Sequence, residues 1–223
     1  MKRSFLCLAG AAFLLGQLAA DDSRPASGGY ITITPPPRPN SDHKIIIPSL
    51  SNITFPQIRQ AAEQGDAEAQ CNLGLCYATG DGVEKDMAEA VRWWRKSAEQ
   101  GNAVAQYNLG QCCRTGEGIE KNMGEAVRWY RKSADQGYAD AQFNLGVCYS
   151  DGIGVKKDAK QAVYWWRKAA EQGHAYAQNN LGTCYYNGIG VKKDKKQGIR
   201  WWRKAAEQGH EDAKETLRRL NKK

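Results

Sequence analysis

The chain has 223 residues, and its 32 Lys and Arg residues exceed its 24 Asp and Glu residues, which gives a formal net charge of +8 at pH 7. This excess is spread over predicted turns and helix surfaces. We therefore interpret it as a solvated outer face and not as a nucleic-acid site, the alternative meaning of a basic stripe. The N-terminal apolar run, residues 5–15, is shorter than the roughly 20 residues of a membrane-spanning helix, which argues against an integral membrane protein.

The first 20 residues have the outline of a signal peptide. A basic start at residues 2–3 precedes the apolar run of residues 5–15, and small residues follow up to Ala20. Cleavage after Ala20 would leave Leu18 at a position where a smaller residue is usual, so a retained anchor is the alternative. We predict a signal peptide over residues 1–20 and an exported protein, periplasmic or secreted, with no stable membrane insertion after cleavage.

The next segment, residues 21–55, has no helical periodicity and is rich in proline at residues 35–39. We predict that it is a disordered, extended tether. Within it, Ser41 and Lys44 match the Ser-x-x-Lys spacing of penicillin-recognising enzymes, but no companion motif accompanies them. Chance explains this match better than catalysis does.

A tripeptide, Glu-Gln-Gly, recurs along the remaining chain at intervals of 36 residues or multiples of it. It ends at residues 65, 101, 173 and 209, and Asp-Gln-Gly at residues 135–137 fills the gap. A period between 20 and 50 residues is typical of stacked supersecondary units. We therefore predict a domain over residues 56–223 that contains repeats 66–101, 102–137, 138–173 and 174–209.

Each repeat has the pattern of a helical hairpin. In the first repeat, Leu73 and Cys76 share the apolar face of a first helix, which Gly80 ends because glycine tolerates the left-handed conformation. Asp86, followed by Glu89, starts the second helix with a capping-box pattern. The same start recurs in the other repeats, as Asn122 with Glu125, Asp158 with Gln161 and Asp194 with Gln197.

The second helices carry aromatic residues at two adjacent positions. One set lies on the apolar stripe and is predicted to form the hydrophobic seam of the stack. The other set points about 100° further round the helix, so we expect it to be only partly covered. Regular helical spacing favours packing over an aromatic platform for sugars or bases. The seam set is Trp94, Tyr130, Trp166 and Trp202, and the neighbouring set is Trp93, Trp129, Trp165 and Trp201.

Both ends of the predicted stack look like half-repeats. Residues 56–65 resemble a second helix without its first, and residues 210–223 a first helix without its second. The second of these segments ends in basic residues, so it can face water, as the terminal unit of a solenoid must.

The third repeat holds the most complete motifs. They are Ala141-Gln142-x-Asn144-Leu145-Gly146-x-x-Tyr149, Gly152-Ile153-Gly154-Val155 and Ala162-Val163-Tyr164-Trp165-Trp166-Arg167-Lys168. With the unit length, these motifs resemble the Sel-one-like repeat family, a relative of the tetratricopeptide repeats, over residues 57–220. The resemblance implies an all-α fold, a right-handed superhelical α-solenoid that serves as a scaffold or adaptor for protein complexes. Cys113 departs from the pattern, because the other repeats have Tyr there, and we expect it to loosen the second repeat.

Six cysteines follow the predicted signal peptide, and an even number in an exported protein permits disulfides. Four of them occupy one position in successive repeats, where packed helices lie about 8–10 Å apart, too far for a disulfide. We therefore predict buried free thiols and leave the paired alternative open. The six are Cys71, Cys76, Cys112, Cys113, Cys148 and Cys184.

The first helices are expected to line the concave face, and they carry Asn at one repeated position. By resemblance to tetratricopeptide grooves, this Asn column clamps the backbone or the terminal carboxylate of a peptide, although packing between first helices explains it equally well. Positions around the column vary between repeats, which favours a binding groove for a protein or peptide. The predicted site is Asn72, Tyr107, Asn108, Gln111, Arg114, Phe143, Asn144, Val147, Asn179, Asn180, Thr183 and Tyr186.

Signals of catalysis and of metal binding are nearly absent from the sequence. No nucleophile elbow or phosphate-binding loop occurs, and the Gly-x-Gly turns follow helices instead of strands. His174 and His210 have no third ligand nearby in sequence, so we expect no metal site and no cofactor. We predict a non-catalytic scaffold, with a weak hydrolase of β-lactam or cell-wall substrates as the alternative.

Overall fold

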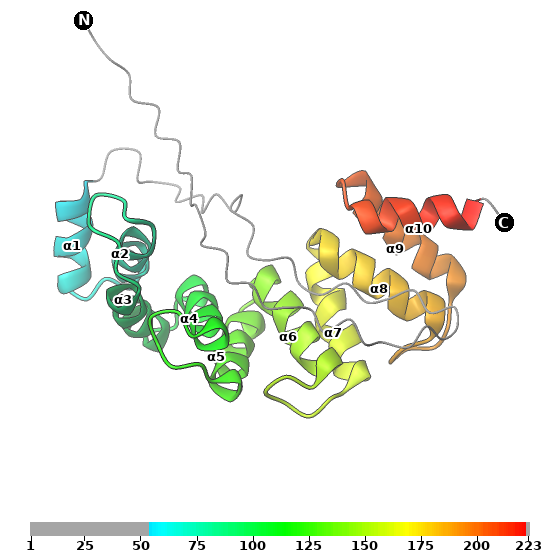
Figure 1. Cartoon of the computed structure of the whole chain (residues 1–223), viewed down its shortest axis with the longest axis horizontal. Helices are drawn as coiled ribbons and strands as arrows, with labels where there is room; N and C mark the ends of the chain where they lie inside the picture. Colours follow the sequence, from blue (N-terminus) through cyan, green and yellow to red (C-terminus); the bar gives the residue numbers. More distant parts are fainter. Residues whose placement is uncertain (1–53, 222–223) are drawn as a thin grey trace, which may run out of the picture.

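The structure, a computed structural model, describes residues 54–221. The predicted signal peptide, nearly all of the predicted tether, and Ser41 with Lys44 lie outside these residues. The described chain is all-α, an α-solenoid whose helices follow one another along an arc from α1 to α10 (Figure 1). The helices are α1 (Phe55–Glu63), α2 (Ala67–Thr79), α3 (Met87–Glu99), α4 (Ala103–Thr115), α5 (Met123–Asp135), α6 (Ala139–Asp151), α7 (Ala159–Glu171), α8 (Ala175–Asn187), α9 (Lys195–Glu207) and α10 (Glu211–Asn221).

Four hairpins make up the stack. In each of them a first helix (α2, α4, α6 or α8) packs on a second helix (α3, α5, α7 or α9), and each second helix also packs on the first helix of the next hairpin. The first helices end as predicted, at glycines in the left-handed conformation. Gly80, for example, has φ +82°, and its amide donates to the carbonyl of Cys76 at 2.8 Å. A residue with a Cβ is strained there, so glycine fixes the end of the helix.

The second helices start at the predicted caps, but with only half of the capping box. Asp86 Oδ1 accepts hydrogen bonds from the amides of Ala88 and Glu89 at 2.9 and 3.0 Å. The amide of Asp86 donates to the carbonyl of Tyr77 at 2.8 Å, in place of the side chain of Glu89. The cap residue therefore ties the second helix to the end of the first one. The same tie joins Asn122 to Cys113, Asp158 to Tyr149 and Asp194 to Tyr185, at 2.7, 2.8 and 2.8 Å.

A glycine in each first helix lets the two helices of a hairpin approach closely. A Cβ on Gly146 would lie 2.5 Å from the indole ring of Trp166, which is fully buried. The Nε1 of Trp166 donates to the carbonyl of Phe143 at 3.2 Å, so the ring is held over the glycine by a hydrogen bond. Gly74, Gly110 and Gly182 face Trp94, Tyr130 and Trp202 in the same way.

The predicted hydrophobic seam is confirmed, because Trp94 is 5% exposed and Tyr130, Trp166 and Trp202 are 0% exposed. The expectation that the neighbouring set is partly covered holds for Trp93 and Trp201, which are half-buried, and is wrong for Trp129 and Trp165, at 8% and 4%. Both rings belong to the core cluster that runs across the repeats, and each also has a contact within its own helix. Trp129 donates to Glu125 at 3.3 Å, and the ring of Tyr164 packs edge-on against Trp165 at 4.9 Å.

Pairs of glutamines join consecutive hairpins. The side-chain amide of Gln142 on α6 donates to the carbonyl of Ala134 at the end of α5, at 3.1 Å. The carbonyl oxygen of Gln142 accepts from Gln172 at 2.8 Å, and Gln172 belongs to the recurring Glu-Gln-Gly tripeptide. This explains why that glutamine recurs, since it satisfies a buried polar side chain 30 residues earlier. Equivalent pairs are Gln70 with Gln100, Gln106 with Gln136 and Gln178 with Gln208, at 2.7, 2.8 and 2.7 Å.

The turn between the two helices of a hairpin rests on the preceding hairpin. Gly154 has φ +67°, and a Cβ there would clash with the carbonyl of Met123, the first residue of α5. Gly118 and Gly190 lie in the same way against Met87 and Ala159. The turns of the second, third and fourth hairpins therefore contact the hairpin before them, backbone against backbone.

The two terminal helices cover the ends of the core. Ile58 and Ala62 of α1 pack on Leu73 and Cys76 of α2, and Ala213 of α10 packs with Trp202. Within residues 54–221 no helix has the length and apolar character needed to cross a bilayer.

All six cysteines of the described chain are buried, and they are free thiols in this structure. Burial raises the pKa of Cys71 to about 12 and that of Cys148 to about 11. Buried thiols of this kind remain protonated near neutral pH and act as small apolar side chains.

Candidate partner-binding surface

The Asn column of the first helices lies mostly below the surface. Asn72 is 8%, Asn144 9% and Asn180 0% exposed, and Asn108 is half-buried. Asn144 also hydrogen-bonds to the hydroxyl of Tyr107 in the preceding repeat. The column therefore contributes to contacts between repeats, and Asn108 offers the largest remaining polar surface.

The second repeat brings three of the predicted site residues into one polar network. The hydroxyl of Tyr107 accepts from Gln111 Nε2 at 3.0 Å, and Gln111 Oε1 accepts from Arg114 Nε at 2.9 Å. The hydroxyl of Tyr130 donates to the same oxygen. Burial is the main reason that the pKa of Tyr107 rises to about 12, so its hydroxyl stays neutral near pH 7. The sequence did not reveal that Tyr130, a seam residue, joins this network.

The predicted site residues of the third and fourth repeats are largely buried. Phe143 and Val147 are 3% and 7% exposed, and Asn179 and Thr183 are 3% and 0% exposed. The hydroxyl of Thr183 donates to the carbonyl of Asn179 at 3.2 Å, which shows that it packs within its own helix. Tyr186 is half-buried, with its ring centroid 5.0 Å from that of Trp202. The surface area that these side chains expose to a partner is therefore much smaller than we expected from their variation between repeats.

The structure adds a second feature, an aromatic edge at the N-terminal ends of the first helices. The position before the first helix is Asp66 and Asn102 in the first two repeats and Tyr138, His174 and His210 afterwards. This change along the sequence was the signal that could have revealed the edge. We define the aromatic edge as Tyr107, Tyr138, Phe143, His174, Tyr176 and His210.

Ring contacts join the members of this edge across repeats. Tyr107 lies 5.1 Å from Tyr138 between ring centroids, and Phe143 stacks on His174 at 4.6 Å. Tyr176 then packs edge-on against His210, also at 4.6 Å. Tyr107, Tyr138, His174 and Tyr176 are half-buried, so each ring combines a packed side with an accessible one.

His174 has two polar contacts within the edge. Its Nδ1 accepts from the amide of Ala177 at 3.2 Å, which caps α8, and its Nε2 lies 3.3 Å from Asp140 Oδ1. Partial burial of the neighbouring Tyr138 raises the pKa of its hydroxyl well above 10, with Asp140 adding to the effect. The edge therefore offers aromatic rings with polar tips, the side-chain type that is enriched at protein interfaces.

Within residues 54–221 no group of three His, Cys, Asp or Glu side chains lies close enough together to hold an ion. His174 and His210 instead take part in ring contacts.

Two solved structures are similar to this chain along most of its described part. One is a protective antigen of uropathogenic Escherichia coli with an SLR fold, 44% identical, with a TM-score of 0.69 over 71% of this chain and 34% of that chain. The other is a Sel1 repeat protein from Oxalobacter formigenes, 41% identical, with a TM-score of 0.66 over 71% of this chain and 63% of that one.

A curated relative matches a shorter stretch. It is the secretory immunoglobulin A-binding protein EsiB of Escherichia coli, 43% identical over 52 residues, which are 23% of this chain and 11% of that protein. The chain thus matches less than two thirds of the length of each of these three proteins.

The model of the Sel1 repeat matches residues 67–102, 103–138, 139–174 and 175–210. These matches begin one residue after the repeats that we defined from the sequence, and they cover well over half of the chain. The helical hairpins described above and the two similar structures agree with these matches, and the chain belongs to the Sel1 repeat family.

Proposed function

We propose that this protein is an exported, non-catalytic scaffold that binds a partner protein through the aromatic edge and the adjoining surface of the first helices. The observation that carries the proposal is the set of ring contacts between neighbouring repeats along the aromatic edge, in which four of the six rings are half-buried. Rigid aromatic side chains lose little entropy on binding and supply much of the energy of protein interfaces.

The relatives support the partner class. EsiB is named for binding secretory immunoglobulin A, and the solved E. coli relative is described as a protective antigen. Export rests on the N-terminal sequence pattern. The hydrolase alternative rests on Ser41 and Lys44, which are outside the described residues, and we do not favour it.

The test is affinity capture with the purified full chain. Secretory immunoglobulin A and the soluble proteins of the native compartment serve as separate sources of partner. We expect the double substitution Tyr138→Ala with Tyr176→Ala to weaken capture at least about tenfold, because truncating two interface anchors commonly costs more than 1 kcal/mol each.

Tyr164→Ala is the matched control, since Tyr164 is an exposed tyrosine of α7, 46% accessible and away from the aromatic edge. Circular dichroism checks that all variants keep their helicity. If the double variant captures the partner as well as the wild type does, the aromatic edge is not the binding surface.

A further inference from the structure

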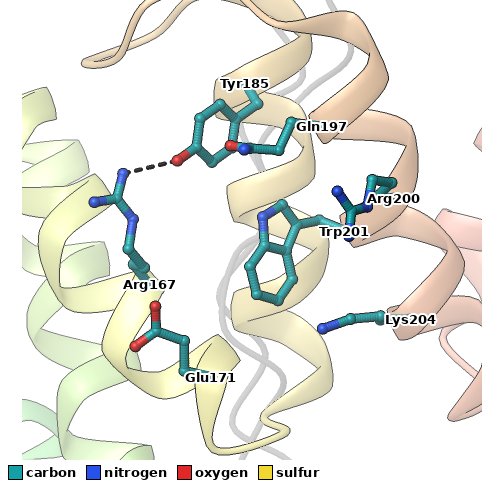
Figure 2. Close-up of a pocket in the computed structure, with 7 residues that line it drawn as sticks. All are labelled: Arg167, Glu171, Tyr185, Gln197, Arg200, Trp201 and Lys204. Atoms are coloured by element: carbon teal, nitrogen blue, oxygen red, sulfur yellow. Dashed lines mark hydrogen bonds between the residues drawn. The ribbon is translucent and has the colours of Figure 1, made fainter.

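A small pocket lies between the second helices of the third and fourth repeats, α7 and α9 (Figure 2). Its volume is about 230 Å³, below the roughly 300–1,000 Å³ of pockets that enclose drug-sized ligands. It therefore suits one small unit of a ligand. The lining residues are Arg167 and Glu171 of α7, Tyr185 of α8, and Gln197, Arg200, Trp201 and Lys204 of α9.

The lining is cationic and has an aromatic face. Three cationic side chains accompany one carboxylate, and Figure 2 shows Trp201 between Arg167 with Glu171 on one side and Lys204 on the other. Arg167 donates to the hydroxyl of Tyr185 at 2.8 Å, which orients the guanidinium. A guanidinium has five N–H donors, so others remain for an anion.

The equivalent position between the first two repeats is filled by the protein's own carboxylate. There Glu125 lies 3.6 Å from Arg95 and accepts from Trp129 Nε1 at 3.3 Å. In the fourth repeat the position of Glu125 is taken by Gln197, which is neutral, and its Oε1 is buried without a hydrogen-bond partner in the described chain. Arg167 therefore lacks the carboxylate that Arg95 has.

The indole that lines this pocket is also less covered than its counterparts in the second and third repeats, Trp129 and Trp165, which are 8% and 4% exposed. Between the second and third repeats, Tyr164 packs edge-on against Trp165 and buries it to 4% exposure. In the fourth repeat Arg200 takes the position of Tyr164, and Trp201 is half-buried. The Lys204 ammonium lies 4.6 Å from the centre of the Trp201 ring and brings a positive charge beside it.

We propose that this pocket binds a carboxylated sugar, such as a hexuronic acid residue of a polysaccharide. The sugar carboxylate pairs with Arg167 and the nearby cations, and one apolar face of the ring packs on Trp201. Glu171 accepts a hydrogen bond from a sugar hydroxyl.

The composition of the lining favours a sugar over other anions. The apolar part of the lining is aromatic, because no aliphatic side chain lines the pocket. A flat aromatic wall suits the face of a sugar ring better than a branched aliphatic side chain of a peptide. Glu171 repels a phosphate dianion but suits a monoanion that carries hydroxyl donors. None of the lining residues belongs to the aromatic edge, so the test of the pocket does not depend on that edge.

Titration of the full chain with methyl β-D-glucuronide, followed by ligand-detected NMR, tests the proposal. We expect methyl β-D-glucoside, which lacks the carboxylate, to bind at least about tenfold more weakly, the loss of one charge-assisted pair. Trp201→Ala and Gln197→Glu should each weaken uronide binding by about the same factor. Gln197→Glu places a carboxylate beside Arg167, as Glu125 does beside Arg95, and keeps the size of the side chain.

Trp93→Ala is the matched control, because it removes the equivalent half-buried indole from the first repeat. It should leave uronide affinity within about twofold, a difference below 0.5 kcal/mol. The proposal fails if the uronide does not bind, if the glucoside binds equally well, if Gln197→Glu has no effect, or if an acetylated acidic dipeptide binds more tightly than the uronide. Should Trp201→Ala not fold, the comparison of Gln197→Glu with the wild type decides alone.

Discussion

His210 is a buried base between the fourth repeat and the terminal helix α10. It is 8% exposed, and neither ring nitrogen has a hydrogen-bond partner in the described chain. Burial is the largest effect and lowers the pKa of His210 below 6.5; Asp212 and Glu211 oppose this shift, and His174 adds to it. The unfolded chain therefore binds a proton on this residue at a higher pH than the folded chain does.

We predict that stability falls as the pH drops below about 6.5, with a slope from this residue of at most about 1.4 kcal/mol per pH unit. Well above that pH the ring is neutral in both the folded and the unfolded chain, so the slope disappears. Urea unfolding between about pH 5 and 8 measures this dependence. His210→Phe keeps a ring against Tyr176 and should flatten the curve. An unchanged slope in the variant would assign the dependence to other groups.

At the scale of the element, the spacing of each hairpin depends on the glycine under the aromatic ring. Gly146→Ala would place a methyl group 2.5 Å from Trp166, which is fully buried and hydrogen-bonded to the carbonyl of Phe143. Because the ring must move and the hydrogen bond must lengthen, we expect a loss of about 2–4 kcal/mol in the free energy of unfolding. Chemical denaturation monitored by tryptophan fluorescence measures it.

Gly124→Ala is the opposite case within a second helix. A Cβ at Gly124 would meet only Asn122 Oδ1, at 3.5 Å, and the residue is exposed. Because no packing contact is disturbed, only the higher helix propensity of alanine changes the stability. We therefore expect the free energy of unfolding to rise by about 0.5–1 kcal/mol. Equal effects of the two substitutions would show that glycine has no packing role in the first helices.

Across the whole molecule, the paired glutamines couple the repeats. Gln142→Ala at the middle of the stack removes the hydrogen bonds from Gln142 to the carbonyl of Ala134 and from Gln172 to Gln142. The Ala134 carbonyl still accepts from the amide of Gly137, and Gln172 still donates to the carbonyl of Gly137, so the loss is the net contribution of two hydrogen bonds, about 1–3 kcal/mol. In a solenoid, weaker coupling between neighbouring units lowers cooperativity. We expect a broader urea transition with a smaller m-value, seen when circular dichroism and fluorescence no longer coincide.

The control is Gln70→Ala, which removes the same kind of pair at the end of the stack. Gln70 donates to the carbonyl of Ala62 and accepts from Gln100, at 3.1 and 2.7 Å. Its loss should loosen α1 and leave the main transition as sharp as in the wild type. A broad transition in Gln70→Ala alone would contradict the coupling role that we assign to Gln142.

The hairpins and their seam were predictable because the signals are local. Asp86 as a helix cap, Gly80 as a helix end and Trp166 on an apolar stripe each follow from neighbours within four residues or so. The pairing of Gln142 with Gln172 spans 30 residues, so it depends on how one hairpin packs on the next. The burial of Trp129 and Trp165 was missed for the same reason.

The candidate surface was harder to predict from the sequence than the hairpins were. Variation between repeats led to Phe143 and Thr183, which are buried, because a core can vary when its neighbours vary with it. Tyr138 and His174 were missed as binding candidates, since their position reads as an ordinary helix cap. Only the ring contacts across repeats show that these caps form an edge.

The seating of each turn on the preceding hairpin has an evolutionary consequence. Because Gly154 meets a main-chain carbonyl, the joint depends hardly at all on which side chains the two units carry. An in-frame duplication of one 36-residue repeat therefore brings with it the backbone contacts to the repeats on both sides. It lengthens the solenoid without changes to the side chains of the core. The length of the solenoid can change by gene duplication, while the residues that contact a partner change independently by substitution.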